Sequence, residues 1–197
     1  MVWGFTQPQT DASKKLRVKM ILKSGAYCIQ DRFLEFDLTA DLEFTDHFNC
    51  YTFTGGNGYG KTSFIEHIII PALERDGIDY LYLGQDIRNQ LYTIKALLAV
   101  RGHKVSGADE NTLLKWWLRQ SDSARVFILD EFDKYFPDSG FIFDRCNAFI
   151  RTYVAVTHLD RDRFQPDPQK YNARRLRFDL VDYNGRVKNI LIRNEDS

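Results

Sequence analysis

Residues 54–63, Thr-Gly-Gly-Asn-Gly-Tyr-Gly-Lys-Thr-Ser, contain the residue types that hold a phosphate group. Gly55, four further residues and then Gly60-Lys61-Thr62 fit the pattern G-x-x-x-x-G-K-[ST]. Glycines let the backbone turn tightly and present N–H groups to phosphate oxygens, and a helix that starts near Gly60 points its positive end at the same anion. Lys61 can reach the β- and γ-phosphates, and the Thr62 hydroxyl can ligate Mg²⁺. We therefore predict a nucleotide-phosphate site made by Gly55, Gly56, Asn57, Gly58, Tyr59, Gly60, Lys61, Thr62 and Ser63.

A second group of chemically capable residues follows an apolar run, Val126-Phe-Ile-Leu, which is typical of a buried parallel strand. Asp130 and Glu131 come directly after it, at the strand end where ligands gather in α/β sheets. We expect Asp130 to hold the Mg²⁺ of the nucleotide and Glu131 to orient or polarise the attacking water. His158, at the end of a further apolar run, is a candidate for contacting the γ-phosphate. Each assignment has an alternative. The run 54–63 could be a glycine-rich turn that matches the pattern by chance, Asp130-Glu131 could be an acidic turn after a strand, and His158 could be a surface histidine.

The elements that must position these residues follow from hydrophobic periodicity. Short core strands are predicted at 49–53, 79–83, 126–129 and 153–157, and helices at 64–73, 87–100, 109–119 and 141–150. Alternating runs at 16–22 and 33–38 precede the glycine-rich loop with no helix between them, which indicates antiparallel strands. Asn184-Gly185, between runs 176–183 and 186–192, is a strong hairpin signal. The pattern predicts an α/β protein with a P-loop NTPase fold: a mostly parallel core sheet, an N-terminal antiparallel β layer and a C-terminal β-hairpin.

Length and composition predict one domain. The chain has 197 residues, of which we expect 1–15 to be loose and 16–197 to form a single nucleotide-binding domain with a helical segment at about 87–120. Lys+Arg and Asp+Glu are both 27, which argues against a strongly basic nucleic-acid surface but leaves a local patch open. The apolar runs are too short to span a membrane, and residues 1–14 lack the apolar stretch of a secretory signal. Three widely spaced cysteines indicate free, mostly buried thiols in a reducing compartment.

Taken in order, the motifs resemble those of the ATP-binding-cassette (ABC) ATPases over nearly the whole chain from about Leu16. Residues 55–62 resemble the Walker A motif, and 126–131 resemble Walker B with its catalytic glutamate. Gln85, at a strand end, resembles the Q-loop glutamine, and Val156-Thr157-His158 resembles the switch-histidine strand. Val105-Ser106-Gly107-Ala108-Asp109 resembles the Leu-Ser-Gly-Gly-Gln signature, with Ala and Asp replacing its last Gly and Gln.

The resemblance implies an ATPase that uses ATP and Mg²⁺. Catalytic roles would fall to Glu131, His158 and Gln85, and the metal would be held by Thr62, Asp130 and Gln85. Ser106 and Gly107 of a second subunit would cap the γ-phosphate, so that ATP joins a homodimer or heterodimer. An aromatic residue before Walker A stacks on adenine in this family; Tyr27 is the candidate, and Phe33 competes with it.

For the biological process, the resemblance favours a cytoplasmic subunit that powers a membrane transport complex, held peripherally at the membrane by a membrane-protein partner. The short helical segment favours an alternative, a non-transport ABC-type ATPase acting on DNA or on another assembly. A third class, an AAA-type or viral genome-packaging motor, would form a ring and need an arginine finger. Arg151, Arg161 and Arg163 are the candidates for that finger.

Overall fold

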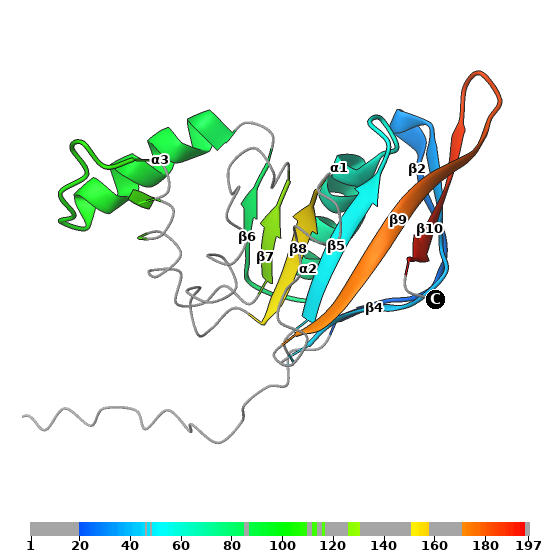
Figure 1. Ribbon diagram of the computed structural model, residues 1–197, viewed down its shortest axis with the longest axis horizontal. Helices are drawn as coiled ribbons and strands as arrows, with labels where there is room; N and C mark the ends of the chain where they lie inside the picture. The colour runs from blue at the N-terminus through cyan, green and yellow to red at the C-terminus, as the bar shows by residue number, and fades with distance from the viewer. Residues whose placement is uncertain are drawn as a thin grey trace, which may run out of the picture.

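An eight-stranded mixed sheet organises the computed structural model, which describes residues 20–45, 47, 49–84, 87–109, 112–113, 116, 126–130, 151–157 and 171–195. Its strands are β2 (Gly25–Ile29), β3 (Leu34–Leu38), β5 (Asn49–Gly55), β6 (Tyr80–Leu83), β7 (Val126–Leu129), β8 (Thr152–Val156), β9 (Asn172–Tyr183) and β10 (Lys188–Asn194). They lie in the order β2-β3-β10-β9-β5-β8-β7-β6, and a separate antiparallel pair is made by β1 (Met20–Leu22) and β4 (Leu42–Phe44) (Figure 1). The predicted α/β class and mixed, mostly parallel sheet are confirmed.

The parallel part of the sheet runs from β9 to β6. Every residue of β7 and of β8 is buried, which explains why these strands appear in the sequence as continuous apolar runs and not as alternating ones. After β5 the chain crosses to β6 at the edge and returns through β7 to β8; β9 then lies on the other side of β5. The order of strands therefore reverses at β5, and in open α/β sheets a ligand site is expected at such a reversal.

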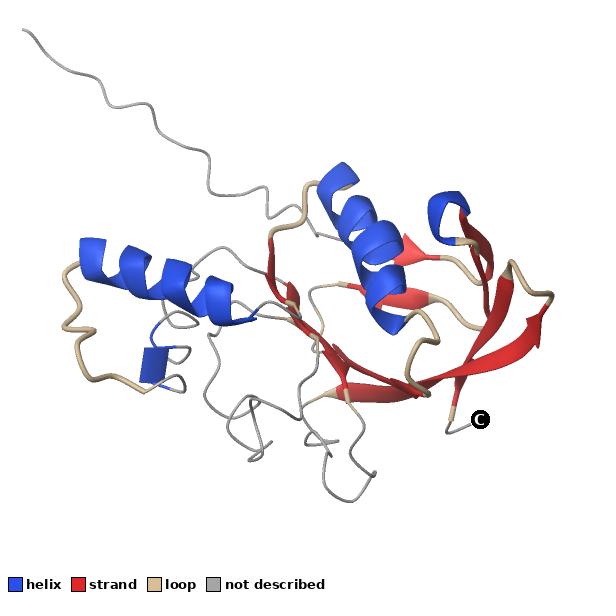
Figure 2. Cartoon of the chain, turned by 90° about the horizontal axis from the view of Figure 1, so that it is seen from above, coloured by secondary structure: helices blue, strands red, loops and turns tan. Residues whose placement is uncertain are grey.

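A continuous helix follows β5 and crosses one face of the sheet (Figure 2). It comprises α1 (Lys61–Phe64), a π-helical segment η2 (Ile65–Ile69) and α2 (Ile70–Arg75), so it extends beyond the predicted end. Pro71 has no N–H to donate to the carbonyl one turn earlier, and its ring crowds that carbonyl. The turn before it is wider than an α-helical turn, because the Ile70 N–H donates to Ile65 O, five residues back. The helix buries Phe64, Ile65, Ile69 and Leu73 against the sheet.

The N-terminal strands differ from the expectation. The predicted run 16–22 contains β1, which pairs with β4 and not with the run at 33–38. The latter forms β3, which pairs antiparallel with β2, a strand that was not predicted, and in parallel with β10, so that β2 and β3 extend the core sheet. The hairpin of β9 and β10 is confirmed, and β9 also pairs with β5. A 3-10 turn η1 (Gln30–Arg32) connects β2 to β3 and ends at Phe33. The C-terminal hairpin therefore links the first strands of the chain to the parallel core.

On the opposite side of the sheet, α3 (Ile87–Val100) confirms the predicted helix. Its buried residues Leu91, Ile94 and Leu98 belong to a second apolar cluster with Phe127 and Tyr153 of the sheet. In the part of the chain that the structure describes, no helix combines the length and the apolar character needed to cross a membrane. The predicted helix 141–150 and the loose segment 1–15 lie outside the described residues.

Candidate functional site

The glycine-rich loop connects the C-terminal end of β5 to the first turn of α1, as the sequence predicts. Gly60 caps the helix in the left-handed region, at φ 76°, and a Cβ there would lie 2.9 Å from the Phe36 ring. A Cβ at Gly55, where φ is 119°, would collide with the backbone carbonyl of Phe178 on β9. Glycine is therefore required at both positions by backbone angle and by space, because the loop rests directly on β3 and β9.

The side chain of Lys61 folds back over this loop. Its ammonium group donates hydrogen bonds of 2.9 Å to the carbonyls of Gly55 and Gly56, and only 7% of the residue is exposed. Burial lowers the pKa of Lys61 below its usual 10.5, while the negative charge of Asp130 partly opposes this shift. A buried cation whose described hydrogen bonds go to two backbone carbonyls is well suited to an anionic ligand.

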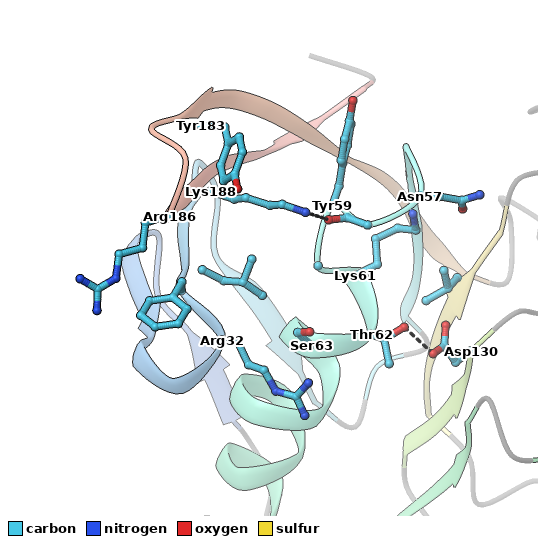
Figure 3. Close-up of a pocket in the computed structure, with 15 residues that line it drawn as sticks. Arg32, Asn57, Tyr59, Lys61, Thr62, Ser63, Asp130, Tyr183, Arg186 and Lys188 are labelled. Atoms are coloured by element: carbon cyan, nitrogen blue, oxygen red, sulfur yellow. Dashed lines mark hydrogen bonds between the residues drawn. The ribbon is translucent and has the colours of Figure 1, made fainter.

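Asp130 and Thr62 meet at the other side of the loop. The Thr62 hydroxyl donates a 2.7 Å hydrogen bond to Asp130 Oδ2, and Asp130 is 1% exposed (Figure 3). The Asp130 backbone N–H donates to Leu83 O at 2.8 Å, which fixes the carboxylate just beyond the end of β7. A hydroxyl and a buried carboxylate are hard oxygen donors of the kind that Mg²⁺ prefers, so this pair fits the predicted metal site.

Strand β8 separates β5 from β7 and so places its own end between the glycine-rich loop and Asp130. Thr157, which follows β8, is fully buried, and its N–H donates to Phe53 O at 3.1 Å. The topology thus brings the ends of three predicted strands to one place. Gln85, Glu131 and His158, to which catalytic roles were assigned, lie outside the described residues.

A pocket of about 420 Å³ opens along the loop and reaches the tip of the C-terminal hairpin. Asn57, Gly58, Tyr59, Gly60, Lys61, Thr62, Ser63 and Asp130, all predicted site residues, line it (Figure 3). The lining also has three cationic side chains that sequence reasoning did not select, namely Arg32, Arg186 and Lys188. With Lys61 they make four cations in the described lining against one carboxylate, Asp130, so this lining has an excess of positive charge that suits an anionic ligand.

Of the two aromatic candidates for stacking on a base, Phe33 lines the pocket and Tyr27 lies outside it. The Tyr27 ring packs edge-on against Phe64, with centroids 6.1 Å apart, and its hydroxyl donates to Lys23 O at 2.6 Å. Phe33 is 43% exposed, and the Arg186 guanidinium lies 4.8 Å from the centroid of its ring. The geometry therefore favours Phe33, the competitor, over Tyr27.

Ser106 and Gly107 are not brought to this pocket. Both are exposed in the loop that follows α3, beyond the β6 edge of the sheet (Figure 1). Asp109, just after them, accepts hydrogen bonds of 2.8 Å from the Thr112 N–H and from the Thr112 hydroxyl, so it caps the next helical turn. Ser106 and Gly107 therefore lie away from the Lys61 pocket of their own chain.

Sequence reasoning missed the hairpin cations because no local motif marks them. Arg186 and Lys188 stand beside the Asn184-Gly185 turn signal, but only the pairing of β10 with β3 carries them to the loop.

A search with family models finds no match to the chain, and a search of curated proteins finds none either.

Proposed function

We propose that this chain binds and hydrolyses ATP with Mg²⁺, as an ABC-type ATPase on a P-loop fold. The observation that carries the proposal is the 2.7 Å hydrogen bond between Thr62 and Asp130. These two oxygen groups come from separate sequence motifs that were each expected to hold the same metal ion. Their direct contact beside a glycine-rich loop is more specific than either motif alone.

Binding would begin with exchange of partners at Lys61. Its ammonium group leaves the carbonyls of Gly55 and Gly56 and donates instead to the β- and γ-phosphate oxygens. The loop N–H groups and the start of the helix at 61–75 supply further donors to the same phosphates. The phosphate charge would be matched by Lys61 and by Lys188, whose ammonium group lies on Gly58 O of the loop.

Thr62 and Asp130 would hold Mg²⁺, and their hydrogen bond already places both oxygens on one side of the loop. When bound, Mg²⁺ would supply positive charge that neutralises the charge developing on the phosphates. Glu131, the next residue, would accept a proton from the attacking water. The end of β8, where Val156 lines the pocket, would close one side of the space for the γ-phosphate and exclude other water from it.

The ABC resemblance extends the proposal to a process. Two chains would associate around ATP, and hydrolysis would release them, driving a partner complex that we expect to be a membrane transporter. Recovery of a membrane protein with the Glu131→Gln chain in the presence of ATP would support this partner. Recovery of DNA or of a soluble assembly would support the non-transport alternative.

Calorimetric titration of ATP into the full chain, with and without Mg²⁺, tests the activity. We expect binding by the unmodified chain, loss of binding in Lys61→Ala, and no change in Lys95→Ala, a control in which an exposed α3 lysine is removed. Release of phosphate from ATP should accompany binding in the unmodified chain. Unchanged ATP affinity in a folded Lys61→Ala variant would refute the proposal.

A further inference from the structure

Phe33 holds an unusual conformation at the edge of the pocket. It is the only non-glycine residue with positive φ among the described residues, at φ 53° and ψ 45°. An L-residue with a bulky side chain is disfavoured there, and such outliers concentrate at ligand sites. Phe33 is 43% exposed and lines the pocket, so a flat ligand can reach it.

The Arg186 guanidinium lies over that ring, 4.8 Å from its centroid. The turn that carries Arg186 is ordered by Asn184, whose Oδ1 accepts hydrogen bonds from the N–H groups of Arg186 (3.1 Å) and Val187 (2.8 Å). The Tyr183 hydroxyl donates to Gly185 O at 3.0 Å across the same turn. Arg186 is therefore presented to Phe33 from a turn that its own side chains organise.

Lys188 ties this turn to the loop and to Phe33. Its backbone N–H donates to Phe33 O at 3.0 Å, at the start of the parallel β3–β10 register that pairs Lys188 with Leu34. Its ammonium group donates to Gly58 O at 3.1 Å. The same residue thus connects the hairpin, the strained aromatic residue and the glycine-rich loop.

The cations at this end of the pocket differ from the other arginines of the hairpin. Arg177 and Arg193 each donate to Asp179 at 2.8 Å, outside the pocket. No ion pair with a described carboxylate is found for Arg186 or Lys188 within residues 20–45, 49–84 and 171–195. An arginine over an exposed ring, without an acidic partner in these segments, is arranged for a planar ligand.

We propose that Phe33 and Arg186 form a clamp for the nucleotide base, with Arg186, from the C-terminal hairpin of the same chain, as a base-contacting residue. This inference rests on the proposed function, since the pocket must hold a nucleotide. In the free protein the guanidinium occupies the face of the Phe33 ring. When a nucleotide binds, Arg186 moves outward by the thickness of one ring, and the base stacks between the two side chains. Lys188 is a positioning residue that keeps the hairpin next to the loop.

The clamp is tested by comparing ATP with inorganic tripolyphosphate, which has the phosphates but no base. Calorimetry is carried out on the full unmodified chain and on Arg186→Ala, Arg186→Lys and Arg193→Ala. We expect Arg186→Ala to bind ATP about tenfold more weakly, the scale of a lost cation–π contact at a partly desolvated site, and to bind tripolyphosphate unchanged. Arg186→Lys should recover little, because an ammonium group cannot stack as a planar guanidinium does.

Arg193→Ala is the matched control: it removes an arginine from β10 and breaks its contact with Asp179, outside the pocket. It should leave both affinities unchanged, so any indirect effect of loosening the hairpin is measured separately. Phe33→Leu should weaken ATP binding as Arg186→Ala does, and the double variant should lose less than the sum of the two, because both act on one base.

The outcomes separate the two proposals. If the unmodified chain binds neither ATP nor tripolyphosphate, the proposed function and the clamp both fail. If it binds both through Lys61 but Arg186→Ala weakens neither, or weakens both equally, the clamp alone is refuted, because Arg186 then supplies nothing to the base.

Discussion

The hydroxyl of Thr62 donates to the carboxylate of Asp130 across 68 positions of the chain, at 2.7 Å. Thr62 is fixed by the first turn of α1, and Asp130 by the hydrogen bond of its N–H to Leu83 O beyond the end of β7. The contact brings together two of the three predicted metal-site residues, of which Asp130 is buried and Thr62 half-buried. A change at Asp130 can therefore test the contribution of Mg²⁺ to ATP binding separately from that of the phosphates.

Asp130→Asn should make ATP binding insensitive to Mg²⁺. The amide oxygen can still accept from Thr62, so the fold is kept, but the negative charge that attracts the metal is lost. We expect the affinity for ATP in the presence of Mg²⁺ to fall by about 10- to 100-fold, the range seen when a side chain that supports a bound metal ion is removed. The affinity for ATP in EDTA should be unchanged. Calorimetry in the two buffers measures both values. Equal losses in both would show that Asp130 acts on the loop and not on the metal.

Binding of ATP should take up protons at alkaline pH. Burial lowers the pKa of Lys61 below 10.5 in the free protein, and phosphate oxygens would raise it again in the complex. A group whose pKa rises on binding favours the complex at low pH, so affinity should be highest below the free-state pKa and fall as pH rises toward 10.5. Titrations in buffers of different ionisation enthalpy report the uptake. Identical heats in all such buffers at alkaline pH would contradict a lysine that changes its protonation.

Glu131→Gln should bind ATP normally and hydrolyse it slowly. The residue follows Asp130, the proposed metal-binding residue, at a position where a carboxylate could accept a proton from water but would not be needed to hold the phosphates. We expect kcat to fall by about 100-fold or more, with unchanged affinity. Phosphate release under saturating ATP gives kcat, and calorimetry gives the affinity. Turnover at the unmodified rate would place the water-activating role on another residue.

The same Glu131→Gln chain should dimerise with ATP and Mg²⁺. Ser106 and Gly107 are exposed and lie away from the pocket of their own chain, so a second chain must supply them if they cap the γ-phosphate. Light scattering should find a monomer without nucleotide and a dimer at saturating ATP, since a ligand bound only by the dimer favours it by linkage.

Ser106→Arg in the Glu131→Gln background is the matched variant for this assembly. It should stay monomeric with ATP while keeping Lys61-dependent binding, because the change lies on an exposed loop far from the phosphates. A Glu131→Gln chain that remains monomeric at saturating ATP would mean that Ser106-Gly107 is a helix-capping turn, or that the partner is a different chain.

Phe33 offers a test of stored backbone strain that is independent of nucleotide. At φ 53° a glycine should be more favourable than an alanine by about 1 kcal/mol, because Cβ is disfavoured in the left-handed region. Phe33→Gly should therefore unfold at higher denaturant concentration than Phe33→Ala. At the exposed strand position Glu35, two residues on, the usual order applies and the alanine variant should be the more stable. The same order at both positions would show that Phe33 is not strained.

The local parts of the site were open to sequence reasoning because short-range rules control them. Residues 54–63 carry the glycines, lysine and threonine in one uninterrupted run, and the turn of the loop into α1 depends mainly on residues within it. The strand before Asp130 is recognisable because a fully buried parallel strand needs a continuous apolar run. Periodicity also located α3 and both strands of the C-terminal hairpin.

Two features required the tertiary structure. Local pattern cannot report which strands become neighbours, so neither the insertion of β8 between β5 and β7 nor the parallel pairing of β3 with β10 was predicted. That pairing selects Phe33 over Tyr27, and it places Lys188 on Gly58, 130 positions earlier in the chain. A motif can be recognised because its residues are neighbours in the sequence. A pocket wall built from distant strands depends instead on how those strands pair, and their register is set by which faces of the sheet are buried.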